Sequence, residues 1–297
     1  MSMRVPSRRL WLLSLTLLAL AVMPRAAAGA DRAAIEQPIM MDSNGPGSEL
    51  YVLDESGVLH EFRVMENGLA EYGRVSVPSN FVAADISFLQ SKSPASVLIA
   101  GTQSGRGMVV RLSLGSSVLQ TWGFQNVCSG VDSGASGNTA YVATSDSNEI
   151  YKLDTRQPHA TLIARIPDAS KLGPVAFDEG RQEIYVADVA SGEVYQYSIA
   201  TKTSKVFVTH LSAPTALVFD AETDRLFIAD PGQRAIFVAD TRAARPVATL
   251  FASDPLKAPY GMTLISEDRV AVADHSSNSI FVFSGKGALL FRYPAAK

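Results

Sequence analysis

The chain has 297 residues, of which 47% are hydrophobic, with 26 Lys and Arg against 29 Asp and Glu and a single Cys. This length suits one large domain or two ordinary ones, each able to bury a core. One Cys excludes an intrachain disulfide framework and a cysteine-rich metal module. The net charge of −3 gives no reason to expect nucleic acid as a partner.

The first thirty residues have the three-part layout of an export signal. A basic start (Arg4, Arg8 and Arg9) precedes an apolar run over residues 10–22, and small residues follow up to Ala30. The apolar run is shorter than the roughly 20 residues that a membrane-spanning helix needs, although a retained anchor stays an alternative. We therefore expect residues 1–30 to be a cleaved signal peptide, and the mature chain to reach the bacterial periplasm or the exterior.

Residues 7–12 also resemble the twin-arginine export motif, so the Sec and twin-arginine routes both stay open. Cleavage after Ala30 removes four arginines and no acid. The mature chain then has 22 basic and 29 acidic residues and a net charge of −7. Such a charge disfavours binding to nucleic acid, and it leaves only transient membrane contact, during export.

The mature chain is built from a recurring unit that contains a short apolar strand. The six copies of this strand are Leu50–Asp54, Val97–Gly101, Ala140–Thr144, Ile184–Asp188, Leu226–Asp230 and Val270–Asp274. Their last residues are separated by 47, 43, 44, 42 and 44 positions, and six such units account for all 267 mature residues. Equal spacing of this kind predicts a closed or stacked repeat architecture.

Each unit is expected to contain four short strands. In the fifth unit these are Pro214–Asp220, Arg225–Asp230, Ala235–Asp240 and Pro246–Phe251, separated by Gly, Pro and Asp. Four antiparallel strands in 40–45 residues are typical of one β-propeller blade. We therefore predict a single all-β domain over residues 31–297, a six-bladed propeller. Its blades span about residues 38–78, 79–124, 125–168, 169–210, 211–252 and 253–297.

Several positions have a structural interpretation within this fold. The second strands are apolar throughout because neighbouring blades cover both of their faces. Gly130 and Gly261 lie where the innermost strands converge, and Cys128 is expected to be a buried core residue. The Asp that ends four second strands (residues 54, 188, 230 and 274) is expected to accept N–H groups of the following turn. The outer strand of blade six comes either from residues 288–293 or from residues 31–37.

The repeat pattern, a Pro-led strand, then Ile/Leu-Tyr/Phe-Val/Ile-Ala-Asp, then Ile/Val-Tyr/Phe, resembles that of NHL-repeat and YVTN-type propellers over residues 38–294. Units four to six match best, whereas Gly101 and Thr144 replace the strand-ending Asp in units two and three. The resemblance implies a six-bladed propeller. It leaves the activity open, because such propellers serve as binding platforms, lactonases, lyases and sensor domains.

The sequence is also distantly similar to the senescence-marker/gluconolactonase propellers, which hold one divalent metal in the central channel. Glu36-Gln37-Pro38 resembles the Glu-x-Pro start of that family, but Tyr260 stands where the family has a carboxylate in the segment 259–263. A hard divalent ion needs several converging oxygen ligands. Glu36 alone is therefore a weak metal candidate, and Ca²⁺ or Zn²⁺ is expected only if this resemblance extends to activity.

No other set of residues predicts catalysis. The four histidines have no metal-ligand spacing, and the chain has no nucleophile elbow or phosphate loop. We therefore predict no catalytic residue and no cofactor. The polar loops between second and third strands and between blades are the candidate binding face, with these residues as its candidates: Asn80, Arg106, Asn126, Arg234, Tyr260 and His275.

These observations favour an exported, monomeric, non-catalytic binding or scaffold module. It would engage an unidentified protein or small molecule at the channel mouth. Two alternatives remain: a gluconolactonase-like metal-dependent lactone hydrolase, and a cofactor-dependent oxidoreductase-like propeller.

Overall fold

The structure is a computed structural model that describes residues 35–45, 49–90, 95–115, 117–266 and 268–294. The predicted signal peptide, residues 1–30, lies outside these residues, so its cleavage stays a prediction. Among the described residues, no helix has the length and hydrophobicity needed to span a membrane.

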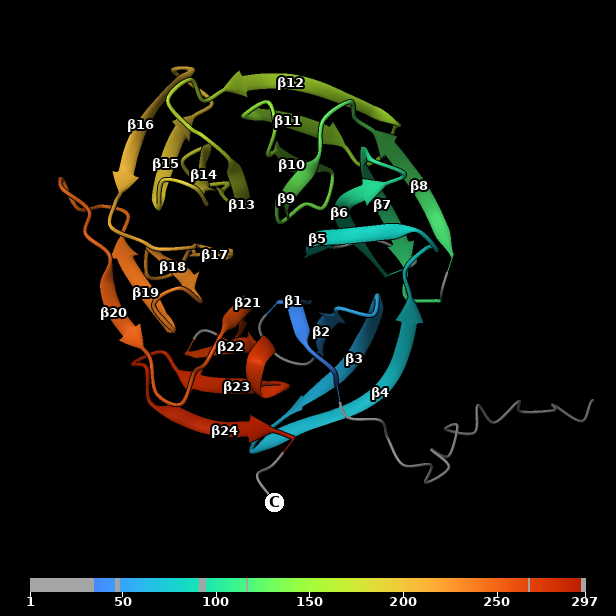
Figure 1. Cartoon of the computed structure of the whole chain (residues 1–297), viewed down its shortest axis with the longest axis vertical. Helices are drawn as coiled ribbons and strands as arrows, with labels where there is room; N and C mark the ends of the chain where they lie inside the picture. Colours follow the sequence, from blue (N-terminus) through green and yellow to red (C-terminus); the bar gives the residue numbers. More distant parts are fainter. Residues whose placement is uncertain (1–34, 46–48, 91–94, 116, 267, 295–297) are drawn as a thin grey trace, which may run out of the picture. The chain divides into compact units, whose positions relative to one another are not determined.

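The predicted fold class is confirmed. In the described part of the chain, six four-stranded antiparallel sheets surround a common axis, and each sheet is built from four consecutive strands (Figure 1). We number these sheets as blades one to six in chain order. The innermost strands surround the axis and the fourth strands form the rim.

The four strands of each blade follow one another outward from the axis. The innermost strands are β1 (Pro38–Ser43), β5 (Phe81–Phe88), β9 (Cys128–Ser133), β13 (Leu172–Asp178), β17 (Ala216–Asp220) and β21 (Pro259–Ser266). The second strands are β2 (Glu49–Asp54), β6 (Ser96–Gln103), β10 (Thr139–Thr144), β14 (Glu183–Asp188), β18 (Arg225–Asp230) and β22 (Arg269–Asp274). The third strands are β3 (Val58–Met65), β7 (Arg106–Ser113), β11 (Glu149–Asp154), β15 (Glu193–Ser198), β19 (Ala235–Asp240) and β23 (Ser279–Ser284). The outermost strands are β4 (Gly68–Ser76), β8 (Val118–Gly123), β12 (His159–Arg165), β16 (Thr203–Val208), β20 (Thr249–Ala252) and β24 (Leu289–Tyr293).

The hydrophobic core is divided among the interfaces between blades. Each pair of neighbouring blades encloses one cluster of buried apolar side chains. In β2, Tyr51 and Leu53 pack toward blade two, whereas Leu50 and Val52 pack toward blade six. Because alternate side chains of a strand point to opposite faces, a strand between two blades must be apolar at every position.

The innermost strands approach one another so closely that only Gly fits at some positions. A Cβ on Gly130 would lie 2.4 Å from the carbonyl oxygen of Gly173, and one on Gly261 would lie 2.7 Å from that of Ile39. Within blade two, a Cβ on Gly101 of the second strand β6 would lie 2.1 Å from the carbonyl oxygen of Val82 on β5. This contact leaves no room for a side chain at the position where four other units have Asp.

The ring closes between blades one and six without strand exchange. All four strands of blade six come from the C-terminal segment, with β24 as its outer strand, as the first of the two predicted schemes has it. Ser43 Oγ donates to the carbonyl oxygen of Leu264 at 2.6 Å across this seam. Ile35 is 2% exposed and packs in the cluster that joins the two blades, so the segment before β1 also contributes to the closure.

The Asp residues that end second strands cap turns, as predicted, and they also fix the loops between blades. Asp230 accepts N–H groups of Ser212 at 2.7 Å and Ala213 at 3.1 Å from the preceding loop, and of Gln233 at 3.2 Å from the following turn. Asp188 and Asp274 make the same two sets of bonds. One carboxylate thus ties two loops to each of these strands.

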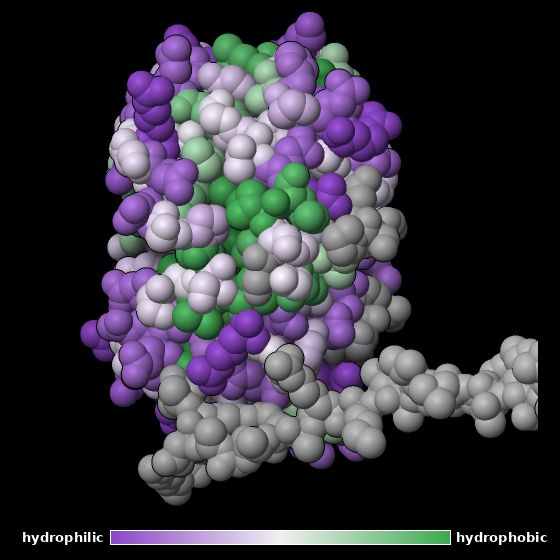
Figure 2. Space-filling model, turned by 90° about the vertical axis from the view of Figure 1, so that its right-hand side faces the viewer, coloured by the Kyte–Doolittle hydropathy of each residue, from purple (hydrophilic) through white to green (hydrophobic). Residues whose placement is uncertain are grey.

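The outermost strands carry exposed apolar side chains among polar ones. On β8, Val118 is 50% exposed and Leu119 is 40% exposed. Figure 2 views the side of the propeller that carries β4 and β8, and it shows an apolar area bordered by hydrophilic residues. The outermost strands are therefore more exposed to solvent than the inner three strands of each blade.

Candidate functional site

A cavity of about 730 Å³ lies among the innermost strands, and all six blades contribute to its lining. It extends from the middle of these strands to the turns that connect first and second strands, where Asn44, Gln90, Ala135, Glu179 and Ala221 border it. A volume of this size falls within the range of small-molecule sites in proteins.

Three carboxyl groups line the cavity on blades one to three. They belong to Asp42 on β1, Asp85 on β5 and Asp132 on β9. Each accepts the N–H of the residue that follows it, at 2.7 to 2.9 Å. The side chains are therefore held in fixed positions along the channel edge of their strands.

Each of these carboxylates also binds the next blade. The bonds run from Phe88 N–H to Asp42 at 2.7 Å, from Val131 N–H to Asp85 at 2.9 Å and from Phe177 N–H to Asp132 at 2.7 Å. The inner edge of a first strand has no neighbouring strand to take up its N–H groups. The three aspartates therefore satisfy edge donors and connect blades one to four.

Three hydroxyl groups complete the acidic side. Thr263 on β21 donates to Asp42 Oδ1 at 2.9 Å, which links blade six to blade one. Ser87 Oγ lies 3.0 Å from Ser133 Oγ, beside Asp132. The polar groups of the cavity thus come mainly from one half of the ring.

The environment disfavours ionisation of all three acids. Burial, together with the neighbouring Asp42 carboxylate, raises the pKa of Asp132 to about 7. Burial raises the pKa of Asp85 well above its usual value, with smaller contributions of the same sign from Asp132 and Asp42, and burial also raises the pKa of Asp42. The backbone N–H bonds oppose these shifts without cancelling them. At mildly acidic to neutral pH, Asp132 therefore retains protons that an ordinary carboxyl group would have lost.

The residues of β13, β17 and β21 that line the cavity are uncharged. Most of them are apolar, including Phe177, Phe219 and Met262, which also pack in the clusters between blades. The cavity therefore has an acidic half and an apolar half.

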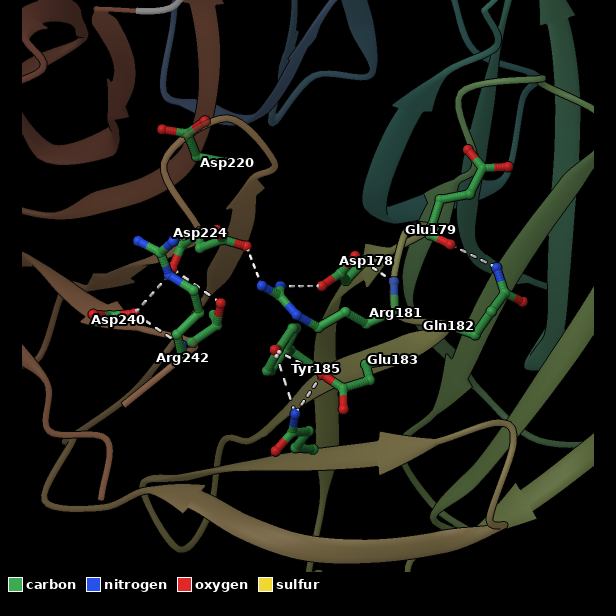
Figure 3. Close-up of polar contacts among 12 residues, drawn as sticks. Asp178, Glu179, Arg181, Gln182, Glu183, Tyr185, Asp220, Asp224, Asp240 and Arg242 are labelled. Carbon is green, nitrogen blue, oxygen red and sulfur yellow. Dashed lines mark hydrogen bonds and ion pairs between the residues drawn. The ribbon is translucent and has the colours of Figure 1, made fainter. Parts of the chain in front are cut away.

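Beside Glu179 and Gly180, which border the cavity, a group of ion pairs joins blades four and five; Figure 3 shows these contacts. Arg181 donates to Asp178 at 2.7 Å and also pairs with Asp224, which Arg242 approaches at 3.3 Å. The Glu179 side chain points away from Arg181, and its carboxylate accepts the N–H of Ala135 from blade three at 2.8 Å. These contacts hold the turns around the cavity opening.

The predicted binding face lies in other loops. Asn80, Arg106 and Arg234 are exposed. Tyr260 and His275 come together, with ring centroids 5.0 Å apart. The side-chain amide of Asn126 donates to Glu149 at 3.2 Å.

None of these six predicted residues lines the cavity, which extends toward the turns between first and second strands. The role of the six stays a prediction.

The metal candidate also lies outside the cavity. Glu36 is exposed and does not belong to the lining. Among the described residues, no group of three or more His, Cys, Asp or Glu side chains has an arrangement suited to a metal ion. The three cavity aspartates therefore do not form a ready coordination sphere.

His60 and Cys128 carry side chains of reactive types, but their surroundings give both a structural role. His60 lies between Asp54, with Nε2 2.9 Å from Oδ2, and Glu71, with Nδ1 2.8 Å from Oε1. Burial opposes ionisation of both acids, but bonds to His60 and, for Glu71, to Arg74 leave their pKa values below the usual range. Cys128 is buried, as predicted, and burial raises the pKa of its thiol to about 12.

Sequence reasoning missed the three cavity aspartates. The available signal was an acidic residue inside an innermost strand, followed within two residues by Ser: Asp42-Ser43, Asp85-Ile86-Ser87 and Asp132-Ser133. Three such occurrences in consecutive units indicate acidic side chains near the axis, although Asp85 is offset from the other two in its pairing with the second strand. Units four to six have no such pair, so the pattern does not repeat around the ring.

Comparisons with known proteins establish the fold. No family model matches the sequence, and no curated protein matches it. A chain in the crystal structure of a nidogen/laminin complex superposes with a TM-score of 0.70 at 15% identity, covering 83% of this chain and 93% of that one. A structural genomics protein of unknown function from Bacteroides thetaiotaomicron gives a TM-score of 0.65 at 13% identity, covering 84% of this chain and 69% of that one. At these identities the similarity shows a shared β-propeller fold.

Proposed function

We propose that the protein is an exported, non-catalytic binding module that takes a small-molecule ligand into the cavity at the centre of the ring. The observation that carries this proposal is the cavity of about 730 Å³, lined by the innermost strands of all six blades. A concave site with an apolar part and a few convergent polar groups is the usual form of a small-molecule site.

Two further observations support binding over catalysis. The lining, as far as the structure describes it, contains no His, Cys, Lys or Arg that would pair with the acids as a nucleophile or base. The aspartates also accept backbone N–H groups of neighbouring blades, which gives them a structural role. The similarity to a chain from a nidogen/laminin complex is consistent with a propeller that works by binding.

Export is the second part of the proposal. It is supported by the basic, apolar and small-residue segments of residues 1–30 and by the acidic charge of the remaining chain. The gluconolactonase-like alternative has no such support, because Glu36 does not lie in the cavity lining.

The proposal is tested by blocking the cavity mouth. Ala135 and Ala221 are exposed residues of the mouth, so Trp at both positions obstructs the opening without entering the core. Ala244→Trp, at an exposed position outside the lining, is the matched control. A panel of cationic, neutral and anionic small molecules is screened by thermal shift against the wild type and both variants.

We expect a compound that raises the melting temperature of the wild type and of Ala244→Trp but not of Ala135→Trp/Ala221→Trp. A compound that stabilises all three proteins equally contradicts binding in the cavity. Chemical conversion of a bound compound by the purified protein contradicts the non-catalytic assignment.

A further inference from the structure

We propose that the ligand of the cavity is a small organic cation, whose ammonium group binds beside Asp42, Asp85 and Asp132 and whose apolar body packs against Phe177, Phe219 and Met262. This inference rests on the proposed function, because it names the chemical class of the ligand that the cavity takes.

The ionisable residues of the cavity lining all carry charge of one sign, which is negative. The ionisable lining residues are the three aspartates of β1, β5 and β9 together with Glu179 of the turn between β13 and β14. The lining contains no Lys, Arg or His among the residues that the structure describes. A cavity with walls of low polarizability and charges of one sign attracts ligands of the opposite sign.

The aspartates and the apolar lining residues lie in different parts of the cavity. All three aspartates come from blades one to three, whereas the strands of blades four to six contribute uncharged side chains such as Phe177, Phe219 and Met262. A bare metal ion gains nothing from the apolar half of a cavity of about 730 Å³. A cation with an apolar body makes use of both halves, and its charge can also contact the aromatic rings.

The carboxylate of Asp85 has hydrogen-bonding capacity beyond its backbone bonds. An ionised carboxylate offers about four acceptor positions. Asp85 accepts two backbone N–H groups in the described structure, from Ile86 and Val131, one on each oxygen. Each oxygen therefore keeps acceptor capacity for a donor inside the cavity. An ammonium group with N–H donors suits this position, and charge-assisted bonds of this kind are the strong ones.

Binding of a cation is expected to be coupled to proton release. Burial raises the pKa values of all three aspartates, and repulsion from neighbouring carboxylates adds to the shifts of Asp85 and Asp132. A bound cation favours the ionised forms and therefore lowers these pKa values. The cation competes with protons, so its affinity rises as the pH is raised through about 7, the value for Asp132.

The test uses matched sets of compounds that share an apolar body. One set is 2-phenylethylamine, 2-phenylethanol and 3-phenylpropanoate, and the other is hexylamine, hexanol and hexanoate, with CaCl₂ alone as the metal probe. Affinities are measured by isothermal titration calorimetry at pH 8 and pH 5.5, in two buffers of different ionisation enthalpy so that released protons are counted.

We expect the amines to bind at least about tenfold more tightly than the alcohols of the same set, as the contribution of a charged hydrogen bond requires. Amine binding releases protons at pH 5.5 and weakens by about tenfold or more between pH 8 and pH 5.5. Asp85→Asn and Asp132→Asn weaken amine binding, whereas Asp240→Asn, on the exposed end of β19, leaves it unchanged. The pH dependence of amine binding to the wild-type protein tests the proposal even where a variant does not fold.

Alcohols or carboxylates that bind as tightly as the amines overturn the cationic ligand but leave the binding function standing. If no compound of any charge binds, both proposals fail. Binding of Ca²⁺ that the same Asn variants weaken, without amine binding, assigns the acids to a metal site and overturns the inference.

Discussion

At the level of single residues, the aspartates of the innermost strands combine two roles that conflict energetically. Each fixes an N–H group of the next blade, which stabilises the ring, but each is also buried near other carboxyl groups. A carboxyl group whose pKa is raised by folding binds more protons in the folded state than in the unfolded state. Its contribution to stability is therefore largest at low pH and is lost as the pH rises toward 7.

Asp132→Asn tests this conflict. The Asn side chain keeps one acceptor oxygen but brings an NH₂ group toward a backbone donor, so the variant is expected to be less stable than the wild type by about 1–3 kcal/mol at pH 5. Because Asn does not ionise, this difference narrows as the pH rises from 5 to 8, through the Asp132 pKa of about 7. Urea unfolding at both pH values measures it. A difference that widens with pH contradicts the raised pKa.

At the level of strands and loops, the Asp that ends a second strand holds the loops on both sides of it. Asp230 accepts three backbone N–H groups from these loops and is fully buried. Asp240, at the end of the neighbouring third strand, is exposed and accepts one, from Arg242. An Asp at the end of a second strand therefore holds two loops in place, whereas an Asp at the end of the neighbouring third strand does not.

We expect Asp230→Ala to lower the free energy of unfolding by about 1–3 kcal/mol or more, because it leaves buried donors without partners. Asp240→Ala is expected to change it by less than about 0.5 kcal/mol, as is usual for exposed positions. Chemical denaturation of both variants makes the comparison. Equal effects of the two substitutions contradict the role assigned to Asp230.

The second strands and their turns were predictable from the sequence because they repeat. Ile184–Asp188 and Leu226–Asp230 show both the apolar core positions and the capping Asp. The cavity was not predictable in this way, because its walls are assembled from strands about 45 residues apart. Asp85 pairs with the residue directly before Gly101, whereas Asp42 and Asp132 pair with residues three positions before Asp54 and Thr144. Counting from the recurring second strand therefore does not align Asp85 with the other two.

At the level of the whole molecule, the ring is closed by side chains and not by a shared sheet. Ile35, Ser43 and the hydroxyl of Thr263 contact residues across the seam between blades one and six. Stability of the closed ring should then depend on a residue that precedes the first strand. The sequence left this open, since it allowed the N-terminal segment to be either an outer strand or no part of the fold.

Ile35→Ala tests the closure. Removing a buried Ile side chain costs about 2–5 kcal/mol in other proteins, and we expect a loss in that range from thermal or urea unfolding. Glu36→Gln, at the exposed neighbouring position, is the control and should leave the stability unchanged within about 0.5 kcal/mol. An Ile35→Ala variant as stable as its control shows that the segment does not contribute to ring closure.

The central claim is that the ligand binds in the cavity of the ring, and methionine methyl groups report on it directly. Met40, Met41 and Met262 line the cavity, whereas Met65 and Met108 do not. Spectra of the protein labelled with ¹³C at methionine methyl groups are recorded while 2-phenylethylamine is added at pH 8. We expect the signals of Met40, Met41 and Met262 to shift and those of Met65 and Met108 to stay in place. Shifts confined to Met65 or Met108, or no shift at any of the five, contradict the claim.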